Sequence, residues 1–249
     1  MTRDLLWRGM LAGILAALLA TLFARAFAEP QIDLAIGVEQ SHAAHHMSGP
    51  APAAEPEEEL VSRSTQKGAG LLTAMALYGA AVGGIFALVF AYGYGRFGAA
   101  GPRSLALLMA GLVFLLVVVV PAIKYPQTPP AVGKHETVGL RTAAYFAMIV
   151  LSLGAAVIAG KVRAVLAARS GRGFDATLLA VGSYCAIVGL GQFLLPTVDE
   201  VPADFPATLL WNFRVASIGT QFLLWATIGI AFGLWAETVL KRQGASPAR

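Results

Sequence analysis

The residues of this chain best suited to coordination chemistry are histidines grouped in one short stretch. His42, His45 and His46 lie within SHAAHHM and are three of the four histidines of the chain. In a helical turn the i, i+3, i+4 spacing puts such side chains on one face. Imidazole suits divalent transition metals and is mostly neutral near pH 7. The stretch therefore predicts a metal-capture site, with a histidine-rich polar loop as the alternative.

A second group of candidate ligands follows in a proline-rich segment, where His135 stands next to Glu136. An imidazole and a carboxylate could both bind a divalent ion. A later segment adds the carboxylates of Asp199, Glu200 and Asp204. The alternative is that these acids only keep their loop soluble.

The composition shows which kind of element must position these residues. Apolar residues make up 57% of the 249 residues and charged residues 13%, whereas soluble domains carry about 25% charged residues. A helix crosses the bilayer core with about 20 mainly apolar residues. Such stretches predict an all-α integral membrane protein, a bundle of about six transmembrane helices. The predicted spans are residues 5–27, 69–94, 105–123, 142–160, 176–195 and 215–238.

The segments between the spans carry most of the charge. The longest contains GPAPAAEPEEEL, which is rich in Pro, Ala and Glu and cannot bury a core, so we predict that this loop is largely disordered. The predicted connections are an outer His/Pro/Glu-rich loop at 28–68, an outer Pro-rich loop at 124–141, a basic cytoplasmic loop at 161–175, an outer acidic and Pro-rich loop at 196–214, and a cytoplasmic tail at 239–249.

The distribution of Lys and Arg predicts the orientation. With the N-terminus in the cytoplasm, the inner segments hold eleven Lys and Arg and the outer segments six. Positive charge favours the cytoplasmic side. We therefore expect both termini in the cytoplasm of a bacterium, the protein in its inner (plasma) membrane, and the histidine-rich loop in the periplasm.

The first span has two interpretations. ARAFAE has small residues at a spacing suited to signal cleavage after Ala28, with Arg3 and Arg8 as a basic flank. Cleavage would leave five spans. The apolar run is long for a signal, and Gly9 with Gly13 forms a small-xxx-small pair typical of packed membrane helices. These features favour a retained helix.

Polar residues in or beside the spans are the remaining candidates, because such residues are often functional in membranes. They either line an outer entrance and a permeation path or, as the alternatives, form interhelical hydrogen bonds and anchor the helices at the interface. The predicted entrance and path residues are Lys124, Tyr125, Arg141, Gln192, Arg214 and Gln221.

Several functions lack their sequence signatures. The chain has no phosphate-binding loop, no H-E-x-x-H, no CxxC and no nucleophile elbow. No histidine lies in a span, and Cys185 is the only cysteine, so we expect neither a buried bis-histidine haem nor a cysteine-based zinc site. We predict no enzyme activity, no permanently bound cofactor and no nucleic-acid partner.

Two stretches carry a family resemblance. VVPAIKYPQTPPAVGKHETVGLRTAAY and VPADFPATLLWNFRVASIGTQFLLWATIGIAFG resemble the CbtA family, the proposed cobalt transporter subunit of bacteria. His135 and SHAAHHM stand outside the matching positions. The residues that match are Lys124, Tyr125, Pro126, Pro129, Pro130, Glu136, Arg141, Pro202, Phe205, Pro206, Trp211 and Arg214.

The resemblance implies an inner-membrane protein for cobalt uptake linked to cobalamin synthesis. It also implies a small one-span partner subunit of the CbtB type that bears histidines. Cobalt, or nickel, would be the transported ion rather than a cofactor. Two hypotheses stay open from the sequence: a divalent-metal permease, and a non-transporting membrane protein that assists assembly or senses metal.

Overall fold

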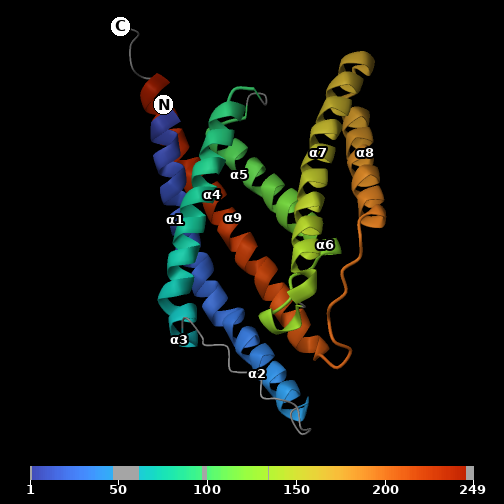
Figure 1. Ribbon diagram of the computed structural model, residues 1–249. Coiled ribbons are helices and arrows are strands. Elements are labelled where there is room, and N and C mark those ends of the chain that lie inside the picture. Colours follow the sequence, from blue (N-terminus) through green and yellow to red (C-terminus); the bar gives the residue numbers. More distant parts are fainter. Residues whose placement is uncertain (1, 47–61, 97–99, 134, 245–249) are drawn as a thin grey trace. The chain divides into compact units, whose positions relative to one another are not determined.

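The computed structural model describes residues 2–46, 62–96, 100–133 and 135–244. All regular elements in this part of the chain are helices (Figure 1). Six of its helical stretches are long and apolar enough to cross a membrane, which confirms the predicted all-α, six-span architecture. These stretches are Thr2–Phe27, Gln66–Gly93, Pro102–Lys124, Val138–Arg169, Gly173–Leu194 and Ala207–Lys241.

The chain divides into two compact units, and each is described by itself. Unit 1 contains Met1–Val113, Pro129–Ala131 and Phe205–Arg249, and unit 2 contains Phe114–Thr128 and Val132–Asp204. The elements of unit 1 are α1 (Thr2–Phe27), α2 (Glu29–His46), α3 (Arg63–Thr65), η1 (Gln66–Gly70), α4 (Leu71–Gly93), α5 (Pro102–Val113) and α9 (Ala207–Gly244). The elements of unit 2 are η2 (Phe114–Val119), α6 (Val120–Lys124), η4 (His135–Thr137), α7 (Val138–Ser170) and α8 (Gly173–Leu194), and the short η3 (Pro130–Val132) spans a border between the units.

Glycines let α1 and α4 cross with their backbones in contact (Figure 1). A Cβ atom added at Gly13 would lie 1.8 Å from the carbonyl oxygen of Gly79, and one added at Gly83 would lie 2.1 Å from that of Gly9. Small residues at such crossings allow the close packing that drives helix association in lipid. The predicted packing role of Gly9 and Gly13 is confirmed.

Helix α9 completes unit 1 by packing against α1 and α5. A Cβ at Gly229 would lie 2.8 Å from Cβ of Ala110, and one at Gly219 would lie 2.9 Å from the ring of Phe23. Phe232 stacks edge-on against Phe90, with ring centroids 5.0 Å apart. The core therefore combines close helix approach with aromatic packing.

The segment predicted as a largely disordered loop at 28–68 begins with a helix instead. The N–H of Ala28 donates to the carbonyl of Ala24 at 2.8 Å, and that of Ile32 donates to the carbonyl of Ala28 at 3.1 Å. The backbone therefore continues with helical hydrogen bonds from α1 into α2. Within unit 1, α2 contacts α1 and α9, and its residue Ala35 is buried. The stretch predicted as disordered, GPAPAAEPEEEL, lies outside the described residues. Whether the first span is retained or cleaved stays a prediction.

Unit 2 consists mainly of the antiparallel pair α7 and α8 (Figure 1). The hydroxyls of Ser152 and Tyr184 form a hydrogen bond of 2.9 Å between them. Met148 and Ala144 of α7 pack with Val120 of α6. This small core leaves much of α8 exposed, as befits a lipid-facing helix.

The helices extend past the predicted spans into the polar connections. Helix α7 runs through the predicted loop 161–175 to Ser170, α9 begins at Ala207 within 196–214, and it continues to Gly244 in the predicted tail. Helical hydrogen bonding does not stop where the apolar residues stop, so hydropathy underestimates helix length. Gly171, with a φ of 66°, ends α7 in the left-handed conformation that glycine adopts most readily.

Candidate functional site

Helices α6 and α8 are joined where they end by three residues, Lys124, Tyr125 and Gln192, which we call the α6–α8 clamp. Lys124 Nζ donates to the backbone carbonyl of Gln192 at 2.5 Å. The Tyr125 hydroxyl donates to the carbonyl of Pro196 at 2.7 Å. Gln192 Nε2 donates back to the carbonyl of Val120 at 3.3 Å. Each of these three predicted entrance residues therefore makes a hydrogen bond between the end of α6 and the end of α8 or the residues that follow it.

The clamp satisfies groups that a helix end leaves without partners. The last four carbonyls of a helix have no intrahelical donor and carry partial negative charge. Gln192 lies in the last turn of α8. The ammonium of Lys124 therefore supplies both the missing hydrogen-bond donor and a positive charge at this helix end. Burial raises the pKa of the Tyr125 hydroxyl, so it keeps its proton and remains a donor at neutral pH. Interhelical hydrogen bonding was predicted as the alternative role of Gln192, and its side chain makes such a bond to Val120.

Arg141 and Glu200 form a second contact in unit 2. The Arg141 guanidinium pairs with the Glu200 carboxylate, whose side chain is only 6% exposed. The Thr137 hydroxyl also donates to this carboxylate. A Cβ added at Gly133 would lie 2.5 Å from a guanidinium nitrogen of Arg141, so the arginine lies over a glycine backbone.

The carboxylate of Glu200 accepts from the guanidinium of Arg141 and the hydroxyl of Thr137, so Glu200 holds the segment after α8 to the start of α7. A role of Glu200 as a metal ligand stays a prediction. Arg141, predicted at the entrance, is likewise half-buried in this pair.

The pair of His135 and Glu136 lies in η4, the short helical turn before α7. Glu136 is exposed. The backbone keeps the two residues adjacent in η4. Their role in metal binding stays a prediction.

The backbone of α2 is helical through His46, as the spacing of its histidines requires. His42 and His46 follow the buried Ala35 by seven and eleven positions. At about 100° per residue, they fall within about 20° of its direction on the helix, whereas His45 lies about 80° away. Positions 42 and 46 of the α2 backbone, one turn apart, are thus in register with Ala35.

Among the side chains that the structure describes, no group of three or more His, Cys, Asp or Glu residues is arranged to hold a metal ion. The side chains of the α2 histidines are not part of that description.

Arg214 and Gln221 belong to unit 1, on α9. Arg214 is half-buried in the first part of this helix. The Gln221 amide hydrogen-bonds the hydroxyl of Tyr78 on α4, which is again an interhelical bond. The six predicted entrance and path residues are therefore divided between the two units, with Lys124, Tyr125, Arg141 and Gln192 in unit 2.

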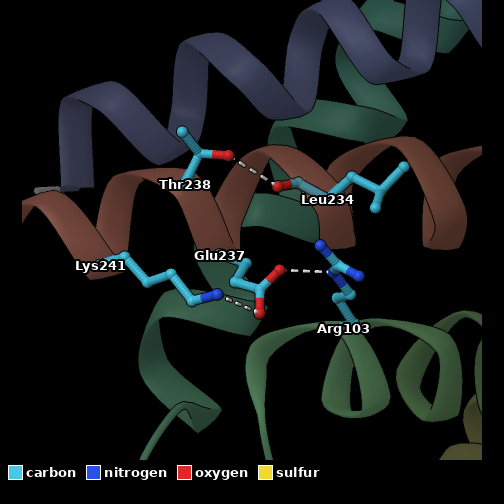
Figure 2. A network of polar contacts seen from close by, with 5 residues as sticks. All are labelled: Arg103, Leu234, Glu237, Thr238 and Lys241. Atoms are coloured by element: carbon cyan, nitrogen blue, oxygen red, sulfur yellow. Dashed lines mark hydrogen bonds and ion pairs between the residues drawn. The ribbon is translucent and has the colours of Figure 1, made fainter.

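A polar network in unit 1 was not predicted from the sequence. Figure 2 shows Glu237 of α9 between two cations: Arg103 Nε lies 2.5 Å from one carboxylate oxygen and Lys241 Nζ 3.1 Å from the other. Thr238 donates to the carbonyl of Leu234 at 3.1 Å on the same helix (Figure 2). Only the i, i+4 spacing of Glu237 and Lys241 was a signal in the sequence. The network fixes the start of α5 to the last turns of α9.

The comparisons with known proteins agree with the architecture. The CbtA family, described as "Probable cobalt transporter subunit (CbtA)", matches residues 2–237. No similar curated protein and no similar solved structure were found. The match covers all six candidate spans except the last residues of α9, and it includes both proline-rich motifs. This six-span membrane protein therefore belongs to the CbtA family, which is described as a probable cobalt transporter subunit.

Proposed function

We propose that this chain is the membrane permease subunit through which a divalent transition-metal ion, cobalt in the first place, enters a bacterial cell. The observation that carries the proposal is the family match over nearly the whole chain, including all six candidate spans. A subunit that is almost entirely membrane-spanning has the architecture of a permease rather than of a soluble carrier.

Capture of the ion is assigned to the histidines of α2. His42 and His46, one helical turn apart, form the best-spaced pair, and His45 is the third candidate. Ala35 of α2 is fully buried, which supports a defined position for this helix in unit 1; the exposed salt bridge between Asp33 and Lys67, at 3.1 Å, adds little. His135 and Glu136 are the second candidate pair, on unit 2.

The energy for uptake would come from the membrane potential, an ion gradient or a separate subunit, because this chain has no phosphate-binding loop. A dication moving inward across about 100 mV gains about 4.6 kcal/mol, from about 2.3 kcal/mol for each charge. This is enough for substantial accumulation without a second energy source.

The family description as a subunit supports a partner. We propose a small one-span membrane subunit of the CbtB type, and a cell in which the imported cobalt feeds cobalamin synthesis. The charge distribution supports an inner-membrane location with both termini in the cytoplasm.

A non-transporting role in assembly or metal sensing is the competing function. It is favoured by one observation: the polar groups of the α6–α8 clamp are engaged in structural bonds, and the described side chains contain no cluster of three metal ligands. Under this alternative the α2 histidines would bind metal but no ion would cross.

Uptake of radioactive Co²⁺ by cells expressing the chain and its partner tests the capture step. Changing His42 and His46 together to alanine removes two proposed ligands and is expected to reduce uptake at low Co²⁺ by at least about tenfold, the lower end of the loss seen when one group supporting a metal site is removed, and to leave uptake at saturating Co²⁺ unchanged. His45→Ala is the matched control and should have a smaller effect. Equal loss of uptake at every Co²⁺ concentration would contradict a capture role.

A further inference from the structure

Two polar atoms inside unit 1 are buried and are paired with no group in the described part of the chain: Oε1 of Gln221 and Nε1 of Trp225. Trp225 is only 7% exposed. Buried polar groups in proteins nearly always have a hydrogen-bond partner, and the need is stronger between membrane helices, where lipid supplies none. These two atoms therefore indicate a ligand.

The two side chains lie close to each other. They are four residues apart on α9, so they project from the same face one turn apart. Both meet α4: the Gln221 amide bonds the Tyr78 hydroxyl, and the Trp225 ring lies 6.4 Å from the ring of Phe86, centroid to centroid. The amide has two polar ends and Tyr78 engages one of them. Rotating the amide by 180° would exchange the ends and still leave one unpaired.

The chemistry of the groups defines the ligand. The indole N–H only donates, so it cannot coordinate a metal ion. The amide oxygen only accepts, so it disfavours an anion. A ligand must accept from Trp225, donate to Gln221 and be small enough for the interior of a helix bundle. Water has this combination, and buried waters typically make about three such bonds.

We propose that Gln221 and Trp225 together bind one water molecule inside the membrane-spanning part of unit 1, between α9 and α4. The water accepts the Trp225 N–H and donates to Gln221 Oε1, and the bond between Gln221 and Tyr78 fixes the amide in place. This site is independent of the transported ion and of the proposed function.

A double-mutant cycle on the full chain in detergent tests the site. Trp225→Phe and Gln221→Leu are each expected to lower the melting temperature by about 3 °C or more, as the loss of one hydrogen bond does in a chain of this size. The double variant should lose clearly less than the sum, because either single change already breaks the bridge. The loss of ring volume in Trp225→Phe is the same in both arms and cancels.

One outcome would overturn the proposal. If the two atoms are dry, Trp225→Phe still leaves a cavity where the indole packed and Gln221→Leu still loses the bond to Tyr78, so the two losses in melting temperature would add. Gln192→Leu, in unit 2, combined with Trp225→Phe is the matched control, since changes at separate sites are expected to add.

Fluorescence gives a second measurement that does not depend on stability. A variant with Phe at Trp7, Trp211 and Trp235 leaves Trp225 as the only tryptophan. A hydrogen-bonded indole is expected to emit at longer wavelength than one in an apolar site, and Gln221→Leu should shift that emission to shorter wavelength. Emission typical of an apolar site that is unchanged by Gln221→Leu would contradict a bound water.

Discussion

Unit 1 and unit 2 are each stabilised by a different kind of internal contact. In unit 1 the backbones of α1 and α4 touch at Gly13 and Gly79, so that no side chain separates them. In unit 2 the pair α7 and α8 has a small core, and side-chain donors at one end tie α6, α8 and the following segment together. A membrane helix bundle can therefore be stabilised either by close backbone packing at glycines or by paired polar side chains. These two kinds of contact should respond differently to substitution.

Three residues that match the family motifs, Lys124, Tyr125 and Arg141, make polar contacts within unit 2. The glycine crossing of unit 1 is a general feature of membrane helices.

The largest effect is expected at the glycine crossing. Gly13→Leu places a side chain where the carbonyl of Gly79 lies 1.8 Å from the added Cβ. Relief requires the helices to separate, so we expect a loss of at least about 3 kcal/mol in the free energy of unfolding. The measurement is the yield of monodisperse protein in detergent and its melting temperature.

Gly111→Leu is the control for this prediction, because an added Cβ at Gly111 meets nothing within 4 Å. This variant should behave like the parent chain. If Gly13→Leu were equally harmless, α1 and α4 would not be in backbone contact in the membrane.

A smaller effect is expected from the charge pair of unit 2. Glu200→Gln keeps the shape of the side chain but removes the charge that faces Arg141. The Glu200 side chain is 6% exposed and that of Arg141 34%, so we expect a loss of about 2 kcal/mol, below the range for a fully buried pair. Urea or thermal unfolding in detergent measures it.

The exposed pair Arg172 and Asp175 provides the contrast, with side chains 79% and 55% exposed. Asp175→Asn should cost no more than about 0.5 kcal/mol. Equal costs for Glu200→Gln and Asp175→Asn would show that the pair in unit 2 does not depend on burial.

Tyr125→Phe tests a single bond of the α6–α8 clamp. It removes the donor to the Pro196 carbonyl and leaves the ring in place, so the expected loss is about 1 kcal/mol. Since burial raises the pKa of this hydroxyl, the bond should persist as pH rises past the usual value of a tyrosine. A difference between parent and Tyr125→Phe that vanishes below pH 9 would argue against the buried donor.

The smallest effect belongs to Asp33 and Lys67, whose side chains are 45% and 41% exposed. Asp33→Asn is expected to cost between about 0 and 0.5 kcal/mol, and high salt should abolish the difference. Limited proteolysis between α2 and α4 at low and high salt would detect it. A cost as large as that of Glu200→Gln would mean that α2 is bound to unit 1 more tightly than its contacts indicate.

Much of the fold could be predicted from the sequence, because the bilayer imposes a length and an apolar composition on each span. The glycine pairs also predicted close helix packing correctly. The helix ends could not be predicted in this way: α2, the end of α7 and the start of α9 are helical in polar segments, where packing and capping decide. Gly171 ends α7, and its φ of 66° identifies it as the residue that terminates the helix.

The candidate site was less accessible to prediction. The polar residues Lys124, Gln192 and Gln221 could be selected by their location, but their partners are backbone carbonyls and a tyrosine on other helices. Which carbonyls a helix end leaves without partners depends on where that helix ends, so the interhelical role became visible only in three dimensions. The ion pair between Arg103 and Glu237 was not predicted because it joins two helices, α5 and α9, that are far apart in the sequence.

Transport by the purified protein tests the central claim most directly. The chain would be reconstituted with the proposed one-span partner in liposomes that contain a Co²⁺-sensitive dye, with a potential of about 100 mV, inside negative. Saturable Co²⁺ entry that increases with the potential and is competed by Ni²⁺ is the expected result. Co²⁺ entry no faster than into protein-free liposomes, with and without the partner, would contradict the assignment as a permease subunit.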